Sequence, residues 1–250
     1  MRRSVKRFGI VLVALIAGLA GAYLIYQGLA YFFPGEESPS AAERAVIESS
    51  PEVIEVLERD FPEDYVELLA SFEAMFEAGA TQENVPELLV DNKRLIVRKY
   101  AGVLSQAPDK DIRTWIAAVS DSVEQLYEQE GAETCSRFSA EGVPALFELG
   151  LAEKYTPVFD HVDALLLNMI AQARSAPEPH NEVTAEDSTA LVELMRESGT
   201  PEEHLAIVFN SDLQNPDFCP AILAYFAALN SLEGDAGMRV RAGFAQSAGR

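Results

Sequence analysis

The sequence predicts an all-α protein, with a single N-terminal transmembrane helix followed by a multi-helix globular domain of about eight or nine helices in helix-turn-helix pairs. Three observations favour this fold class. Apolar residues recur at helical spacing in several segments, and no segment shows the period-two alternation that is typical of strands. Prolines repeatedly precede acidic residues, as they do in the first turn of helices.

The first 33 residues carry the membrane prediction. Residues 1–7 hold four cations, and residues 8–33 hold no charged side chain. A helix over 8–33 would extend about 39 Å, enough to cross a bilayer core of about 30 Å. The alternative is a cleavable signal peptide with an A-x-A-like site ending at Ala22. The apolar run continues beyond Ala22 and ends in aromatic residues, which favours an uncleaved signal-anchor helix.

The charges beside this helix predict its orientation. The cations precede it, and Glu36 and Glu37 follow it within a short linker, residues 34–42. The positive-inside rule makes residues 1–7 a cytoplasmic tail and sets the helix in the inner (cytoplasmic) membrane. The bulk of the chain is then expected in the periplasm or outside the cell. No second stretch is long and uncharged enough to span a bilayer, so one crossing is expected.

Small residues recur within the predicted membrane helix. Ala14, Gly18 and Ala22 are spaced four residues apart and share one helix face. Such a face lets two membrane helices approach closely, so a homodimer through it is one hypothesis. Small residues are also common in membrane helices that have no partner.

Residues 43–232 are predicted to form one all-helical extracytoplasmic domain. Four apolar stripes indicate its core helices, at residues 65–76, 112–127, 158–173 and 218–229. The clearest stripe comprises Ile112, Trp115, Ile116, Val119, Val123, Leu126 and Tyr127. Helix starts are predicted at Pro51, Pro62, Pro86, Pro157, Pro201 and Pro216, and helix ends at Gly79 and Gly131. Residues 175–188 are predicted to be an exposed loop, and residues 233–250 a weakly ordered tail or a last helix.

The chain contains two cysteines, Cys135 and Cys219. Cys219 lies on an apolar stripe, which favours a buried thiol. It also lies beside Pro220 near a predicted helix start, where the pKa of a thiol is lowered and its reactivity is raised. Outside the cytoplasm, an isolated pair of cysteines most simply forms one disulfide. The sequence therefore predicts a Cys135–Cys219 disulfide, with separate thiols or a catalytic cysteine as the alternatives.

Residues 91–100 hold the basic cluster of the predicted domain, Lys93, Arg94, Arg98 and Lys99. One interpretation is a set of ion pairs on a solvated helix face, for which Asp91 is well spaced. The other is a patch that binds an anion or an acidic partner on an otherwise acidic protein.

The remaining polar patterns predict neither a metal nor a cofactor. Asp160, His161 and Asp163 stand close in sequence but lack the i, i+4 ligand pair of zinc helices. The three histidines, which include His180 and His204, are expected to be structural or solvated.

The net charge and the missing motifs disfavour two classes of function, nucleic-acid binding and catalysis. A net charge of −21 repels nucleic acid, so we expect no nucleic-acid binding. The nucleophile-elbow, phosphate-loop, dinucleotide, zinc-protease and redox motifs are missing, which disfavours an enzyme without excluding one. The leading hypothesis is a non-enzymatic interaction or scaffold module of the cell envelope that binds another envelope protein. The alternatives are a membrane-anchored cell-wall hydrolase with an undetected catalytic carboxylate and a helical bundle that binds an apolar ligand.

Overall fold

The computed structural model describes residues 40–81 and 85–248. In this part of the chain all regular structure is helical, which confirms the all-α class. The helices are α2 (Ala41–Ser49), α3 (Pro51–Asp60), α4 (Pro62–Glu77), α5 (Val85–Tyr100), the 3-10 helix η2 (Ala101–Gln106), α6 (Asp109–Glu141), α7 (Val143–Glu148), α8 (Ala152–Ser175), α9 (Ala185–Glu197), α10 (Glu202–Phe209), α11 (Phe218–Ser231) and α12 (Gly234–Ala248).

The predicted number of helices, eight or nine, is too low, because the described residues contain 11 α-helices. The prediction depended on prolines that start helices, glycines that end them and repeated apolar stripes. Helix α2 has nine residues and no proline at its start, and α7 has six residues, so neither is long enough to show an apolar repeat. Short helices of this kind are stabilised by tertiary packing more than by their own sequence pattern.

The predicted membrane helix, residues 8–33, lies outside the described residues, together with Ala14, Gly18 and Ala22. Among the helices that the structure does describe, none combines the length and apolar character needed to cross a membrane. The anchor, its orientation and its cleavage therefore stay predictions.

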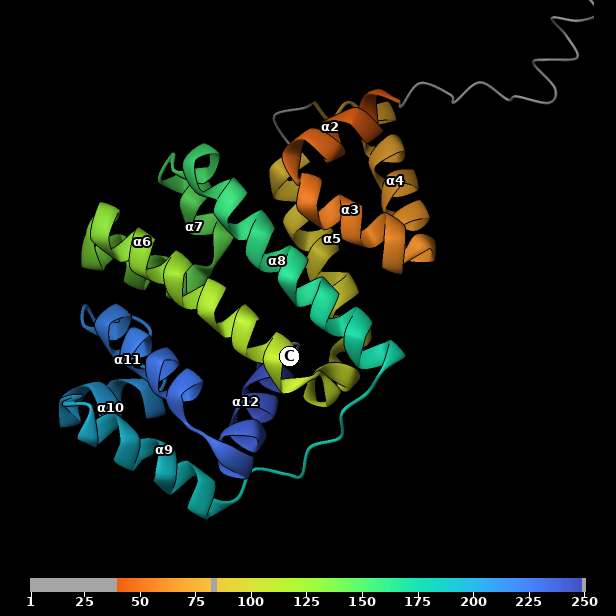
Figure 1. Cartoon of the computed structure of the whole chain (residues 1–250). Coiled ribbons are helices and arrows are strands. Elements are labelled where there is room, and N and C mark those ends of the chain that lie inside the picture. The colour runs from red at the N-terminus through yellow and green to blue at the C-terminus, as the bar shows by residue number, and fades with distance from the viewer. Residues whose placement is uncertain (1–39, 82–84, 249–250) are drawn as a thin grey trace, which may run out of the picture. The chain divides into compact units, whose positions relative to one another are not determined.

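Residues 41–248 are arranged in three groups of helices (Figure 1). Helices α2 to α5 pack together and contact α8, mainly through α3 and also through α5. Helices α6 and α8 lie side by side in the middle, and α11 packs along the other side of α6. Helices α9 to α12 form the third group, and α12 also contacts η2 and α6. The middle pair is thus covered from both sides, and its residues supply much of the core.

The predicted stripe of residues 112–127 is confirmed as core. Ile112, Ile116 and Leu126 are fully buried, and Trp115 is 5% exposed. The Trp115 ring lies 5.7 Å from that of Phe244, between ring centroids, so the stripe on α6 packs against α12. The other predicted stripes also place buried residues in the core, for example Phe72, Ile170 and Phe226.

Proline predicted most helix starts correctly, and Pro157 is the exception. Pro51 and Pro62 occupy the first positions of α3 and α4, as expected. Helix α8 begins at Ala152 and continues through Pro157, so the start predicted there is wrong. Proline at this depth removes one backbone hydrogen bond. The buried face on both sides of Pro157, from Tyr155 to Ala173, indicates that packing outweighs this loss.

Gly131 divides α6 into two parts. Its φ of +84°, in the region that favours glycine, interrupts the helix in its last third, ten residues before Glu141. The prediction that a helix ends there is correct in that local sense. The second part carries Cys135 and Phe138 in a direction that the first part alone would not reach.

The segment predicted to be an exposed loop is bound to the domain at several points. The backbone N–H of Glu178 donates to the Gln106 carbonyl over 2.8 Å, and His180 Nε2 lies 3.0 Å from the Ala107 carbonyl oxygen. Thr184 and Asp187 form a capping box that starts α9.

Within residues 233–250, predicted to be a tail or a last helix, Gly234–Ala248 forms α12, with Val240, Arg241 and Ala245 buried.

We expect Trp115→Ala to lower the free energy of unfolding of the domain by about 3 kcal/mol, because it leaves a large cavity between α6 and α12. This value is the lower end of the range for replacing a buried tryptophan by alanine, about 3–5 kcal/mol. The indole N–H is buried without a hydrogen-bond partner in the described structure, so its removal relieves part of the cost. Urea unfolding followed by circular dichroism measures it, with Trp115→Phe as a milder control. An unchanged unfolding midpoint would contradict the packing of α6 described above.

Candidate functional site

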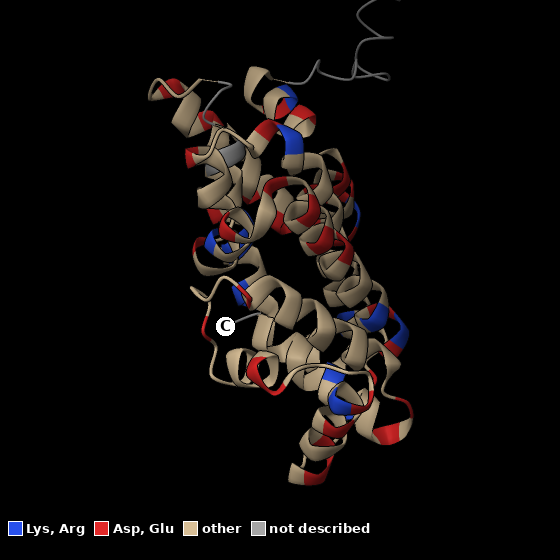
Figure 2. Ribbon diagram, turned by 90° about the vertical axis from the view of Figure 1, so that its left-hand side faces the viewer, with Lys and Arg blue, Asp and Glu red and all other residues tan. Residues whose placement is uncertain are grey.

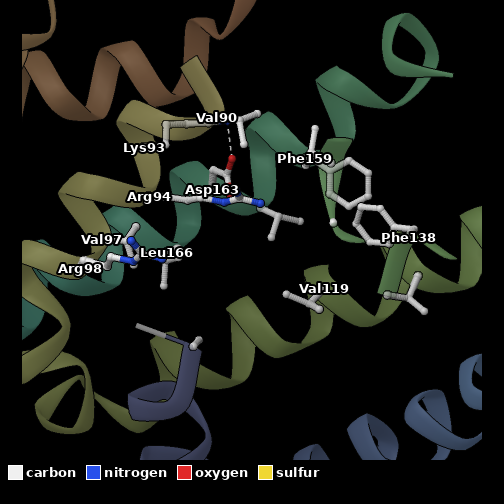
Figure 3. Close-up of a pocket in the computed structure, with 15 residues that line it drawn as sticks. Val90, Lys93, Arg94, Val97, Arg98, Val119, Phe138, Phe159, Asp163 and Leu166 are labelled. Carbon is white, nitrogen blue, oxygen red and sulfur yellow. Dashed lines mark hydrogen bonds and ion pairs between the residues drawn. The ribbon is translucent and has the colours of Figure 1, made fainter. Parts of the chain in front are cut away.

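A cavity of about 440 Å³ lies between α5, α6 and α8. Its volume is within the range of small-molecule sites, about 300–1,000 Å³. Figure 3 shows side chains from all three helices that surround it. The described residues that line it are Val90, Lys93, Arg94, Val97, Arg98, Val119, Val123, Phe138, Gly142, Val143, Phe159, Val162, Asp163, Leu166 and Ala248.

The walls of the cavity on α6 and α8 are apolar. The rings of Phe138 and Phe159 stack with their centroids 4.7 Å apart. Val119 on α6 and Leu166 on α8 continue this surface (Figure 3). Phe138 reaches the cavity because it follows the kink at Gly131, so the bend in α6 helps to form the wall.

The wall on α5 is basic as well as apolar. Val90, Lys93, Arg94, Val97 and Arg98 recur at three- and four-residue spacing, which puts them on one face of α5. The predicted cationic patch therefore faces the cavity as well as solvent. Three of its four members line the cavity.

The cations that line the cavity differ in their partners. Lys93 is only 14% exposed and forms an ion pair with Asp163 of α8. Arg94 Nη1 lies 3.6 Å from Asp91 Oδ1, which agrees with the interpretation of an ion pair along the helix. Arg98 is exposed and has no carboxylate partner among the described residues. Its guanidinium is therefore the most available cation of the patch.

Lys99, the fourth residue of the predicted patch, belongs to another contact. Its Nζ lies 2.6 Å from Oδ1 of the buried Asp64 on α4, and Tyr100 donates a hydrogen bond of 2.6 Å to the other oxygen of that carboxylate. Lys99 thus joins α5 to α4 and does not line the cavity.

The charge of the cavity is opposite to that of the chain. Figure 2 shows Asp and Glu distributed over the helices in view, with Lys and Arg in smaller groups. The net charge of the chain is −21, yet the lining includes three cations and one carboxylate, Asp163. Local charges within a few ångströms act more strongly on a bound group than distant, screened ones.

A second cavity of about 440 Å³ has the opposite character. It is lined by Glu48, Glu52, Glu153 and Asp160, with apolar residues between them. Burial raises the pKa of Asp160, although it accepts a hydrogen bond of 3.0 Å from the Glu52 N–H. Asp160 and Glu52, which also contacts His161, hold α3 against α8, so these two carboxylates have a structural role.

The residues of the Asp160–Asp163 pattern point to different partners. Asp160 accepts from the backbone of α3, His161 Nδ1 lies 2.7 Å from Glu52 Oε2, and Asp163 pairs with Lys93. Within the described residues, no group of three or more histidine, cysteine, aspartate or glutamate side chains is placed to hold a metal ion.

Cys135 and Cys219 lie at disulfide distance, with their Sγ atoms 2.03 Å apart, so the predicted pairing is the one in the structure. Both residues are fully buried. Cys135 precedes Phe138 by one helical turn, so the disulfide fixes the part of α6 that supplies one wall of the cavity to the start of α11.

Sequence reasoning found the basic wall of the cavity but not the apolar walls. Val119 and Val123 belong to the α6 stripe and were predicted to be core residues. The stripe pattern does not distinguish a side chain that packs against a neighbour from one that lines a space. No sequence pattern connects Phe138 with Phe159, because the kink in α6 and the packing of α6 against α8 bring the two rings together.

Comparisons with models of protein families, with curated proteins and with solved structures gave no match. The function is therefore inferred from the geometry and charges of the chain itself.

Proposed function

We propose that the chain is a single-pass, membrane-anchored binding protein without enzymatic activity, whose helical domain holds an apolar ligand in the cavity between α5, α6 and α8. The observation that carries this proposal is the cavity of about 440 Å³ with stacked aromatic and aliphatic walls. Small-molecule sites are concave, mostly apolar spaces of this size, so the cavity favours a guest molecule.

The anchor and the location of the domain are part of the same proposal. Four cations followed by an uncharged apolar stretch support an inner-membrane helix with its N-terminus in the cytoplasm. The Cys135–Cys219 pair supports a domain in an oxidising compartment such as the periplasm, where disulfides persist.

The cavity supports ligand binding over cell-wall hydrolysis. A hydrolytic site needs a carboxylate that can donate or accept a proton beside the substrate. Asp163 is the single carboxylate among the described residues that line this cavity, and Lys93 pairs with it. The Lys93 ammonium occupies a carboxylate oxygen of Asp163, so this side chain is not free to approach a substrate.

The scaffold hypothesis remains the second candidate, supported by a groove on α9 to α12. Val183 and Phe209 line it and are 41% and 50% exposed, and Tyr225 and Phe244 lie beside them. Exposed apolar residues that share a groove are typical of protein contacts. Site-directed cross-linking from position 209 in membranes tests it, and a failure to trap another envelope protein there would count against it.

Photolabelling tests the proposed function on the full chain in nanodiscs of zwitterionic lipid. A photoreactive alkanol that carries a diazirine in its chain should label residues that line the cavity, as mapped by mass spectrometry. We expect Val119→Trp to abolish this labelling, because the indole fills the space between α6 and α8. Val66→Trp, the same change at a 65% exposed position of α4, should leave it intact.

A second blocking variant distinguishes a filled cavity from a misfolded protein as the cause of lost labelling. Val97→Phe fills the cavity from the α5 wall and should also prevent labelling, while circular dichroism verifies that each variant is folded. Equal labelling of the wild type and of both folded blocking variants would refute the proposed function.

A further inference from the structure

We propose that the cavity between α5, α6 and α8 selects amphipathic anions, molecules with one alkyl chain and a carboxylate or phosphate head group. This inference rests on the proposed function, because it assigns a ligand class to the same cavity. It adds a specific role for Arg94 and Arg98, which would bind the head group.

The cations and the aromatic rings of the cavity lie on different walls. The cations come from α5, whereas Phe138, Phe159 and Val119 come from α6 and α8 (Figure 3). A wholly apolar guest would leave the basic wall without a partner, and a small inorganic ion would leave the aromatic wall bare. A guest with a charged head and an alkyl tail matches both walls at once.

The available cations determine the sign of the head group. Lys93 and Asp163 neutralise each other, so they contribute little net charge. Arg98 has no carboxylate partner in the described part of the chain, and Arg94 has only the exposed Asp91 at 3.6 Å. Two arginines four residues apart on one helix face can bind the same anion. The guanidinium group matches carboxylate and phosphate oxygens in a bidentate manner.

Arg94 is also placed to close one side of the cavity. A Cβ atom built on Gly142 would lie 3.4 Å from Arg94 Nη2, so the guanidinium reaches from α5 to the junction of α6 and α7. An anion bound against α5 would meet Arg94 and Arg98 on the same helix face. The rest of the acidic surface would repel larger polyanions, which favours a ligand with a single small head group.

Competition against the photoreactive alkanol tests the selection. The competitors share one alkyl chain and differ in head group: dodecanoate, dodecyl phosphate, dodecanol and dodecyltrimethylammonium. We expect the two anions to prevent cavity labelling at concentrations about tenfold lower than the alcohol, and the cation to be the weakest. Comparing dodecanoate with dodecyl phosphate distinguishes a free fatty acid from a phosphate-bearing lipid fragment as the source.

The Arg94→Gln/Arg98→Gln variant identifies the residues responsible. It should lose the preference for anions and still be labelled by the neutral probe. Arg44→Gln, at an exposed arginine of α2 that does not line the cavity, should retain the preference. Because each competitor partitions equally into nanodiscs that carry any variant, the change between variants reports on the cavity alone.

The outcomes separate the two proposals. Labelling of the cavity with equal competition by anions and alcohol would overturn the anion selection and leave the proposed function intact. An anion preference that survives in the double variant would overturn the role of the two arginines. No labelling of cavity residues would overturn the proposed function itself.

Discussion

Replacing Cys135 and Cys219 together by alanine is expected to lower the free energy of unfolding by about 4–5 kcal/mol. The disulfide joins residues 84 positions apart, and a long loop loses much conformational entropy when it is closed in the unfolded chain. Both cysteines are fully buried, so the native structure also loses packing at the contact of α6 with α11. Urea unfolding of the double variant and of the oxidised wild type gives the difference.

The reduced wild type is the control for this prediction. It keeps both side chains and lacks only the covalent bond, so it should lose most of the same stability. A loss below about 1 kcal/mol in both proteins would show that the disulfide does not constrain the unfolded chain as the loop-entropy argument requires.

Asp109→Ala is expected to destabilise the domain by about 3–5 kcal/mol, because it leaves a buried arginine without its carboxylate. Arg241 is fully buried, and its guanidinium donates to both oxygens of Asp109 over 2.7 and 2.9 Å. It also donates to the carbonyl oxygens of Leu229 and Leu232. One buried ion pair thus joins the start of α6, the end of α11 and α12.

A double-mutant cycle and a surface control test this prediction. Asp109→Leu/Arg241→Met removes both charges of the pair and should be more stable than the single variant Asp109→Leu, because no fully buried charge is left unpaired and Arg113 keeps Glu233 as a partner. The single variant Arg241→Met completes the cycle. Glu202→Ala removes an exposed partner of Arg196 and should change stability little. Additive effects at positions 109 and 241 would contradict the direct pairing of these two residues.

The same pair makes stability depend on pH. Burial disfavours the ionised form of Asp109, but hydrogen bonds from Arg241 and Arg113 outweigh burial and hold its pKa below the ordinary value. The stabilisation from ionised Asp109 is therefore fully present above the pKa of an unfolded aspartate, about 3.9, and is lost as the pH falls through the lower folded value. The stability of Asp109→Ala should decrease less steeply below about pH 4 than that of the wild type.

The fold class could be predicted from sequence because its signals are local. The apolar period of residues 112–127 and the prolines at positions 51 and 62 each act within a few residues, and the structure confirms them. Pro157 misled the prediction because tertiary packing along α8 outweighs one lost backbone hydrogen bond. The small and polar residues of 233–250 gave no sign that Arg241 would be fully buried.

The candidate site could be predicted only in part, for a related reason. The cations at positions 93, 94 and 98 share a helix face, which spacing reveals. The aromatic wall opposite them depends on the kink at Gly131 and on how α6 packs against α8. These are long-range arrangements that a single sequence does not encode in any short pattern.

Native mass spectrometry of the full chain with added dodecanoate tests whether the α5–α6–α8 cavity binds an alkyl anion. We expect one bound dodecanoate per wild-type chain and per Val66→Trp chain, and none on the folded Val119→Trp variant. Bound dodecanoate in equal amount on Val119→Trp, or none on the wild type, would contradict the claim that the α5–α6–α8 cavity is the binding site.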